Sequence, residues 1–396
     1  MLTVLYMDLE SYGDEDLLTL LQADPEINLV RRAFKNTPDR SNPVFEKELG
    51  EAILEAKADI VFSFNYFPLI SKSVQAVYDE AHALYVSWIY DCPHVSLFSC
   101  TLINPCNRVF IFDSSMYLTF ARQGIPHVYY LPLAVNTDRL DAMQADAALW
   151  QQYQAKVSFV GGLYTESHTF YDRMEEKLDP YTKGYLEALM RAQMNVSGIN
   201  FIQDSITPMV EAGMWKALPM DPNPDGVETT KYLYAEYVIN RKITQTERSA
   251  LLTRLGEEVP TVLYTRDKTF TAEGVTVRGP IDYYNMAPYV FKCSDINLNI
   301  SLRSIHSGIP LRAFDIMGAG GFLLTNYQED FLNFFVPGED FVYYEDADDL
   351  VKKVKYYLEH DYERDEIAHT GYAKIREEHT FHKRLAQILD VVLNGD

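Results

Sequence analysis

The chain has 396 residues, of which 47% are hydrophobic and 13% aromatic, so two or three well-packed domains are expected and global disorder is excluded. Its 57 acidic against 35 basic residues give a formal net charge of −22. Such a surface repels phosphate backbones and anionic lipid, which argues against nucleic acid or a membrane surface as the main partner. A local basic pocket for a small anion is still compatible with this charge.

The cysteines and the first residues indicate in which cellular compartment the protein is expected. There are four cysteines and no CxxC pair, so a disulfide framework is not expected. Cys92, His94, Cys100 and Cys106 lie close in sequence, but their spacing fits no zinc pattern, and we expect no metal and no cofactor. The first residues, MLTVLYMDLESYGDED, lack a signal peptide's basic and apolar regions, and no apolar run is long enough for membrane insertion. We expect a cytoplasmic protein.

The first 150 residues alternate short apolar runs with helical patterns, which predicts a doubly wound parallel sheet, an α/β domain. Helical patterns such as DEDLLTLLQA, VFEKELGEAILEA and SMYLTFARQG separate the predicted strands. The predicted strands are 2–8, 27–34, 58–64, 83–91, 108–113 and 127–133.

A second domain, 151–376, is predicted to begin with the strand KVSFVGG after a polar, Gln- and Ala-rich segment. Its alternation is interrupted at about 165–255 by mostly helical sequence, read as an insertion after the first strand. The predicted strands are 156–162, 261–265, 275–279, 296–301, 322–325 and 341–344. Two such domains facing each other place the carboxyl ends of both sheets toward one cleft, where ligands of open α/β sheets bind.

Residues 301–325, SLRSIHSGIPLRAFDIMGAGGFLLT, combine a charged helix with open backbone. Pro310 suits the first helical position, and Leu311, Phe314 and Met317 form the core stripe. Arg312 and Asp315 share another face, which predicts that they point to the cleft edge. The alternative is a purely structural ion pair.

The amides of Ser307, Gly308 and Ile309 are predicted to lie at the start of this helix, where the helix dipole favours a diphosphate. Asp315 could then accept hydrogen bonds from a sugar hydroxyl pair. The preceding strand delivers Asn299 and Arg303 at its carboxyl end, and Arg303 with His306 could neutralise phosphate. A solvated basic loop is the alternative.

Three further segments carry candidate residues. Gly161 and Gly162 follow the first strand of the second domain, where the backbone must approach a ligand closely or turn tightly. The motif GxGxxG is absent, which argues against a dinucleotide-binding dehydrogenase. Gly279 precedes Tyr283 and Tyr284, which could stack on a base or belong to the core. In the first domain, Asp91 and His94 end a strand, and either could act as a general base or serve ordinary turn chemistry.

Several of these motifs resemble the spore-maturation (CgeB-like) glycosyltransferases. The strongest match is GIPLRAFDIMGAGGFLLT followed by LNFFVPGEDFVYY, with VSFVGGLY and VRGPIDYYNMAPYVFKCSDINLNIS upstream. The front half, with YMDLESYGDEDLL, WIYDCP and YYLPLAVN, resembles the uncharacterised domain that often precedes this one. The resemblance implies a GT-B fold of two Rossmann-like domains and a C-terminal helix, 377–396, that crosses back to the first domain.

The resemblance also implies roles for particular residues. A nucleotide-sugar donor would be held by the second domain and an unknown acceptor by the first, with Ser307 to Ile309 and the Gly161–Gly162 turn facing the diphosphate. Asp315 corresponds to the acid expected on the ribose, where the family more often has Glu. The position of an earlier acid, eight residues upstream, is occupied here by Ser307.

We therefore expect a metal-independent glycosyltransferase that moves a sugar from a nucleotide-sugar, with a UDP-sugar favoured, to an acceptor hydroxyl. One alternative is a non-catalytic module that binds a glycan, a nucleotide-sugar or a protein. A nucleotide-sugar epimerase is a further, weaker alternative. The donor sugar, the acceptor and the stereochemical outcome stay open.

Overall fold

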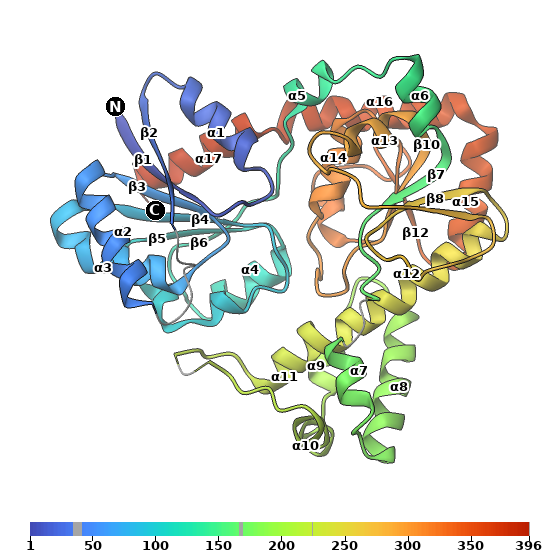
Figure 1. The fold of residues 1–396 in the computed structure, drawn as a ribbon, viewed down its shortest axis with the longest axis horizontal. Helices are drawn as coiled ribbons and strands as arrows, with labels where there is room; N and C mark the ends of the chain where they lie inside the picture. The colour runs from blue at the N-terminus through green and yellow to red at the C-terminus, as the bar shows by residue number, and fades with distance from the viewer. Residues whose placement is uncertain (35–41, 166–168, 224, 396) are drawn as a thin grey trace. The chain divides into compact units, whose positions relative to one another are not determined.

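A computed structural model describes residues 1–34, 42–165, 169–223 and 225–395 (Figure 1). The chain folds into two compact units. The first comprises Met1–Ala134, Pro222–Glu228 and Phe381–Asp396, and the second comprises Val135–Asp221 and Thr229–Thr380.

The first unit is built on a parallel six-stranded sheet in the order β2-β1-β3-β4-β5-β6. β3 reads IVFSF and is buried along its whole length, as expected for a strand covered on both faces. The strands are β1 Leu2–Asp8, β2 Ile27–Ala33, β3 Ile60–Phe64, β4 Leu84–Ile89, β5 Asn107–Ile111 and β6 Val128–Tyr130.

Helices cover both faces of this sheet (Figure 1). On one face, α2, α3 and α4 pack in a core with alternate strand residues. On the other face, Phe381 of α17 lies against Trp88 of β4, with ring centroids 5.8 Å apart. The helices are α1 Asp14–Ala23, α2 Pro43–Ala56, α3 Pro68–Ala81, η1 Val95–Phe98, η2 Cys100–Ile103, α4 Ser114–Ala121 and α17 Phe381–Asn394.

The second unit has a parallel six-stranded sheet of its own, in the order β12-β11-β10-β7-β8-β9. Its strands are β7 Ala155–Val160, β8 Thr261–Tyr264, β9 Val275–Arg278, β10 Ser294–Asn299, β11 Leu323–Asn326 and β12 Val342–Tyr344. Outside the insertion, its helices are α5 Thr137–Ala142, α6 Ala147–Tyr153, α13 Ala287–Cys293, α14 Leu311–Gly318, η4 Glu329–Asn333, α15 Ala347–Glu359 and α16 Asp361–Glu378.

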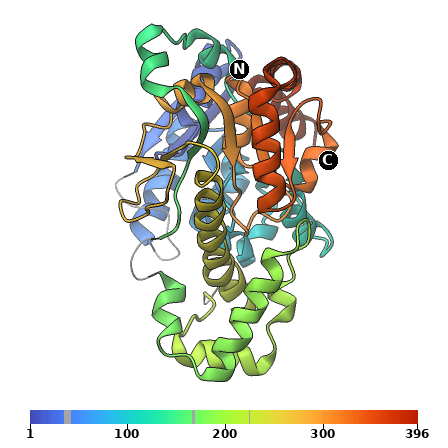
Figure 2. The same ribbon diagram turned by 90° about the vertical axis from the view of Figure 1, so that its right-hand side faces the viewer.

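A helical insertion separates β7 from β8 and has a hydrophobic core of its own. Its helices are α7 Phe170–Glu175, α8 Pro180–Met194, α9 Ile202–Ser205, α10 Pro208–Ala217, α11 Thr230–Leu233, the π-helical segment η3 Tyr234–Ile239 and α12 Asn240–Gly256. Figures 1 and 2 show α12 running from the insertion to the sheet of the second unit, where it packs against β8, β9 and α15.

The predicted strands and the α/β class are confirmed: each predicted strand is present, and its ends differ from the prediction by at most three residues. The predicted GT-B fold is borne out by these two parallel sheets with their helices and by the structural comparisons below. The largest shift is at 127–133, where hydrogen-bonded pairing covers only β6, Val128–Tyr130.

The units divide at Ala134 and Val135, whereas the sequence pattern placed the boundary at residue 150. The reason is packing, since α5 and α6 belong to the second unit. Arg139 of α5 donates to the carbonyl oxygen of Tyr284 at 3.0 Å, and the ring of Tyr153 of α6 stacks on Tyr289. Hydrophobic periodicity shows that a helix buries a face but not which sheet it packs on.

Two segments distant in sequence belong to the first unit. Pro222–Glu228 joins it through backbone hydrogen bonds from Val227 to Phe98 and from Cys100 to Asp225. At the C-terminus, Arg384 of α17 donates from Nε to the carbonyl oxygen of Pro132 at 2.9 Å. α17 begins at Phe381, four residues later than the predicted start of the C-terminal helix.

Gly371 in α16 and Gly184 in α8 provide a matched test of helix packing. At Gly371, an added Cβ would lie 2.2 Å from the backbone oxygen of Asp340 and 3.0 Å from Met317 of α14, whereas at Gly184 it would meet no atom within 4 Å. We expect Gly371→Ala to lower the free energy of unfolding by about 1–3 kcal/mol. Gly184→Ala should raise it by about 0.5–1 kcal/mol through helix propensity. Urea denaturation measures both values, and effects of the same sign would contradict this packing.

Candidate functional site

The strand order of the second unit reverses between β7 and β10. From β7 the chain continues to β8 and β9 on one side, while β10 pairs with β7 on the other side. Ligands of open α/β sheets bind at the carboxyl edge of such a switch point. Gly161 and Gly162 follow β7 here, Asn299 ends β10, and α14 begins 12 residues after the end of β10.

Arg312 is the buried cation of this edge. Its Nη1 donates to Oδ1 of Asn299 at 3.0 Å, and its guanidinium lies 5.0 Å from the centroid of the Phe159 ring. A Cβ at Gly161 would lie 2.7 Å from Nη2 of Arg312, so any other residue would force the guanidinium to shift. An added Cβ at Gly162 would meet no atom within 4 Å.

The charge of Arg312 is poorly compensated. Within the described ranges it forms no ion pair, and its buried Nε has no hydrogen-bond partner. Burial lowers the pKa of Arg312, against the opposing influence of nearby Tyr283, Tyr164 and Asp315. A buried donor without a partner costs free energy, and an anion at this edge would supply the missing acceptor.

Arg248 of α12 places a second guanidinium on the same ring, 5.4 Å from the centroid of Phe159. It is 3% exposed and donates to the carbonyl oxygens of Gly162 and Ile300, which ties the ends of β7 and β10 together. Burial, together with the charge of Arg312, lowers the pKa of Arg248 to about 10, so Arg248 stays protonated at neutral pH. Sequence analysis missed this residue because nothing in the polar sequence of α12 marks it.

Asp315 lies three residues after Arg312 on α14 and is buried. Its Oδ2 accepts a hydrogen bond from Oη of Tyr283. The carboxylate is therefore buried and held by a tyrosine, and its position at the cleft edge stays a prediction. Its assignment to a ribose stays a prediction.

Tyr284 and Gly279, two further candidate residues, belong to the same sequence segment as Tyr283. The guanidinium of Arg139 lies 3.8 Å from the centroid of the Tyr284 ring and covers one of its faces. A nucleotide base would therefore have to stack on the other face of the Tyr284 ring. Gly279 follows β9 at the rim of a cavity of about 490 Å³, also lined by Thr265 and Phe270.

The helix α14 begins at Leu311, and Pro310 is its extended N-cap, with φ −70° and ψ 151°. The prediction that Pro310 is the first helical residue is therefore wrong by one position. The amides that lack a helical acceptor are those of Leu311 and Arg312. Ser307, Gly308 and Ile309 are buried just before the helix.

The buried loop before α14 is fastened by backbone contacts: the carbonyl oxygen of Ser307 accepts from the amide of Asp330 at 3.0 Å, and that of Gly308 accepts from Nε2 of Gln328 at 3.2 Å. The assignment of the Ser307, Gly308 and Ile309 amides to a diphosphate stays a prediction.

Arg303 and His306 point to carboxylates of the helical insertion. Arg303 forms a two-pronged ion pair with Glu247, with Nε 2.7 Å from Oε2, and this carboxylate raises the pKa of Arg303 against the effect of burial. Nε2 of His306 lies 3.1 Å from Oε1 of the buried Glu236. Both side chains anchor the loop to η3 and α12, and their predicted contact with phosphate has no support from these partners.

In the first unit, Asp91 and His94 follow β4 and meet residues that follow β3. Nδ2 of Asn65 donates to Oδ2 of Asp91 at 2.8 Å, and Oδ1 of Asn65 accepts from the amides of Tyr90 and Asp91. Asp91 is exposed. Asn65 directly follows the apolar run of β3, so its position at a strand end was a usable signal.

The ring nitrogen Nε2 of His94 contacts the backbone of Tyr66. The amide of Tyr66 donates to Nε2 of His94 at 3.1 Å, and the carbonyl oxygen of Tyr66 lies 2.9 Å from the same nitrogen. Burial lowers the pKa of His94, partly offset by Tyr66 and by the charge of Asp91. This geometry fits a residue that holds the β3 and β4 ends together better than one that takes a proton from substrate.

No three His, Cys, Asp or Glu side chains of the described residues come together in a way that could hold a metal ion. No helix in the described part of the chain is both long and apolar enough to cross a bilayer.

Residues 248–390 match a family model described as glycosyl transferase-like. The match starts at Arg248, includes α14 and ends within α17. It covers less than half of the chain. None of the curated proteins matches the chain in sequence.

Solved structures share the fold over the full length. A glycosyltransferase from Rickettsia africae ESF-5 is 12% identical, with TM-score 0.53 and coverage of 100% of this chain and 99% of its own. Anabaena Alr3699/HepE, in complex with UDP and glucose, is 11% identical, with TM-score 0.55 and full coverage of both chains. Sucrose-phosphate synthase (tll1590) from Thermosynechococcus elongatus is 10% identical, with TM-score 0.53 and coverage of 99% and 98%. The chain thus has the GT-B glycosyltransferase fold.

The lowered pKa of His94 predicts a pH-dependent stability. Below about pH 6.5 the unfolded state binds a proton that the folded state resists, so the stabilisation is complete above this pH and is lost as the pH falls toward the folded-state pKa. In His94→Gln, the side-chain oxygen can still accept from the amide of Tyr66. Its urea midpoint should therefore fall less between pH 7 and pH 5 than that of the wild type.

The control is His382→Gln, at an exposed position of α17. This variant should retain the wild-type dependence of the urea midpoint on pH. If the urea midpoint depends equally on pH in all three proteins, His94 is not the source of the pH dependence.

Proposed function

We propose that the chain is a glycosyltransferase that binds a nucleoside-diphosphate sugar at the carboxyl edge of the second unit's sheet. The observation that carries this proposal is the pair of buried guanidiniums, Arg312 and Arg248, which share the Phe159 ring without an ion pair to any described carboxylate. The match of residues 248–390 to the glycosyl transferase-like family supports it. The complex of Alr3699/HepE with UDP and glucose favours a uridine nucleotide.

Sugar transfer places negative charge on the leaving diphosphate. The bond between the anomeric carbon and the diphosphate oxygen breaks, a bond to the acceptor oxygen forms, and the acceptor proton passes to a base. Arg312, with its unpartnered Nε, and the free amides at the start of α14 would stabilise the leaving group. In this proposal the fixed cations do the work of a divalent metal, so transfer is independent of added metal.

Asp315 is proposed to accept hydrogen bonds from the ribose hydroxyls, with Tyr283 as a positioning residue. Tyr283 donates to one carboxylate oxygen of Asp315 and so fixes the orientation of the shorter aspartate side chain. For the acceptor proton, Asp91 is the better candidate, because it is exposed while the Nε2 of His94 contacts the backbone of Tyr66. The closer likeness to the spore-maturation enzymes, and the transfer of a hexose, belong to this proposal as well.

Arg312→Gln should separate ligand binding from stability. Removing a buried, uncompensated charge should leave the free energy of unfolding of the ligand-free protein within about 1 kcal/mol of the wild type, or raise it. The Kd for UDP should rise at least roughly tenfold, because a charge-assisted hydrogen bond is lost. Thermal unfolding with and without UDP measures both, since bound ligand raises Tm.

The matched control is Arg191→Gln, at an exposed position of α8. It should keep the wild-type rise in Tm with UDP. If Arg312→Gln also keeps this rise, the diphosphate does not bind at this edge.

Asp91→Asn should leave donor binding unchanged and lower kcat by roughly a hundredfold or more, the usual loss when a general base is removed. The asparagine oxygen can still accept from Asn65, so the loop geometry is kept. UDP release from a UDP-sugar panel, with chelator present, measures the rate.

Asp79→Asn, at an exposed position of α3, is the control for charge removal and should retain the wild-type kcat. Unchanged kcat in Asp91→Asn would exclude Asp91 as the base. Donor binding by the wild type without turnover of any donor would instead indicate a non-catalytic binding module.

A further inference from the structure

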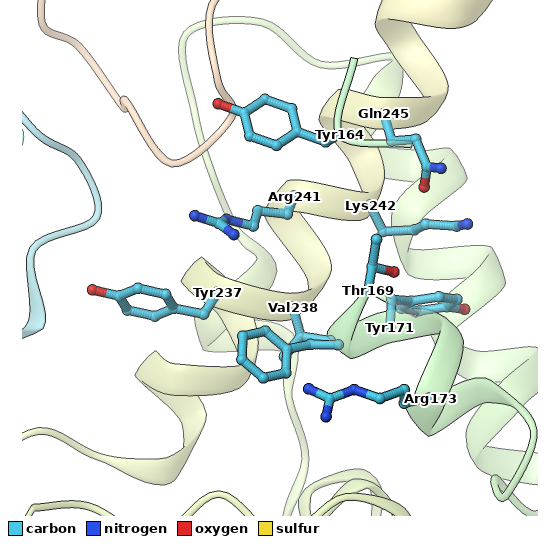
Figure 3. Close-up of a pocket in the computed structure, with 10 residues that line it drawn as sticks. Tyr164, Thr169, Tyr171, Arg173, Tyr237, Val238, Arg241, Lys242 and Gln245 are labelled. Atoms are coloured by element: carbon cyan, nitrogen blue, oxygen red, sulfur yellow. The ribbon is translucent and has the colours of Figure 1, made fainter. Parts of the chain in front are cut away.

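The helical insertion contains a pocket of about 400 Å³ between α7, η3 and α12 (Figure 3). We call it the insertion pocket. This volume falls within the range of about 300–1,000 Å³ of small-molecule sites. Its lining includes four aromatic side chains and three cations: Tyr164, Phe170, Tyr171, Tyr237, Arg173, Arg241 and Lys242.

The insertion pocket is positively charged in a chain of net charge −22. Lys242 is paired with Asp172 at 3.1 Å. Arg173 and Arg241 form no ion pair with any described residue, and their guanidiniums lie over aromatic rings, Arg173 at 4.7 Å from Phe170 and Arg241 at 5.7 Å from Tyr164. In Figure 3 both guanidiniums extend to the side on which the rings of Tyr164 and Tyr237 lie. Two cations are therefore available to an anionic ligand.

Gln245 adds a neutral polar group to the lining. Its side-chain oxygen has no hydrogen-bond partner among the described residues. Carboxylate and phosphate groups only accept hydrogen bonds, so they cannot satisfy this oxygen. A hydroxyl group can donate to this oxygen.

Tyr164 connects the insertion pocket to the edge where the donor is proposed to bind. Its ring lies 5.1 Å from the guanidinium of Arg248 and 5.7 Å from that of Arg241. Its backbone φ is 58°, in the left-handed region that a large side chain rarely adopts and that costs about 1 kcal/mol or more. The packing around Tyr164 therefore holds this strained conformation in place between the two sites.

From these observations we infer that the insertion pocket binds an acidic carbohydrate, a sugar chain that carries carboxylate or phosphate groups. Aromatic rings stack on the apolar faces of sugar rings, the forked donors of arginine match carboxylate and phosphate oxygens, and Gln245 accepts from a hydroxyl. A neutral sugar would leave both arginines without a partner. A simple inorganic anion would not use the rings of Tyr164, Phe170 and Tyr237.

The pocket lies beside the donor edge through Tyr164, and the binding of this carbohydrate is a property separate from the glycosyltransferase function proposed above. The binding itself does not require transfer. It can therefore be tested without any nucleotide-sugar, and its failure is distinguishable from a failure of the proposed function.

The test is isothermal titration calorimetry on the full chain without nucleotide. The carboxylate probe is a hyaluronan tetrasaccharide, with neutral chitotetraose as its match, and the phosphate probe is glucose 6-phosphate, with glucose as its match. We expect at least one acidic probe to bind roughly tenfold or more tightly than its neutral match. Arg241→Gln and the double variant Arg173→Gln/Arg241→Gln should each weaken that binding, the double variant by roughly tenfold or more.

The control is Arg191→Gln, which removes an exposed arginine of the same insertion outside the pocket and should bind like the wild type. Both pocket arginines are exposed, so their substitution should leave Tm unchanged. The inference is overturned if neutral probes bind equally well, if no acidic probe binds at millimolar concentration, or if the pocket variants bind like Arg191→Gln. Displacement of the bound saccharide by UMP would also overturn it, because the pocket would then be a nucleotide site.

Discussion

The second unit is organised around one buried cation, the guanidinium of Arg312. Three residues surround it: Gly161 leaves space beside it, Asn299 accepts a hydrogen bond from it, and the ring of Phe159 lies under it. An uncompensated buried charge is unfavourable, so the packing of α14 against α16 must hold it there. That cost is the usual sign of a site arranged for a ligand of the opposite charge.

The net acidity of the chain and its positive sites are compatible because the positive charge is local. Arg312 and Arg248 both lie on the Phe159 ring at the sheet edge, and Arg173 and Arg241 both line the insertion pocket. By contrast, Arg303 is neutralised by Glu247 and serves to fasten the loop before α14. Which arginines can bind an anion is thus decided by their carboxylate partners and not by the total charge.

The two halves of the fold differ in what their strand ends carry. In the second unit, the ends of β7 and β10 are joined by a cation, Arg248. In the first unit, the ends of β3 and β4 are joined by neutral groups, Asn65 and His94, with Asp91 exposed beside them. The first edge could thus take a proton, whereas the second could hold an anion.

The sequence by itself determined the α/β class, the strands of both sheets and the position of the insertion, because alternation and apolar runs are local properties of the chain. It also singled out Gly161, Asn299, Arg312 and Asp315, which lie at strand ends or on one helix. Only the tertiary structure decided that Arg248 shares their site, that Glu247 occupies Arg303 and that α5 and α6 pack with the second unit. These outcomes depend on distances between residues 52 to 145 positions apart, as in the bonds from Arg248 to Ile300 and from Arg139 to Tyr284, and no local pattern encodes them.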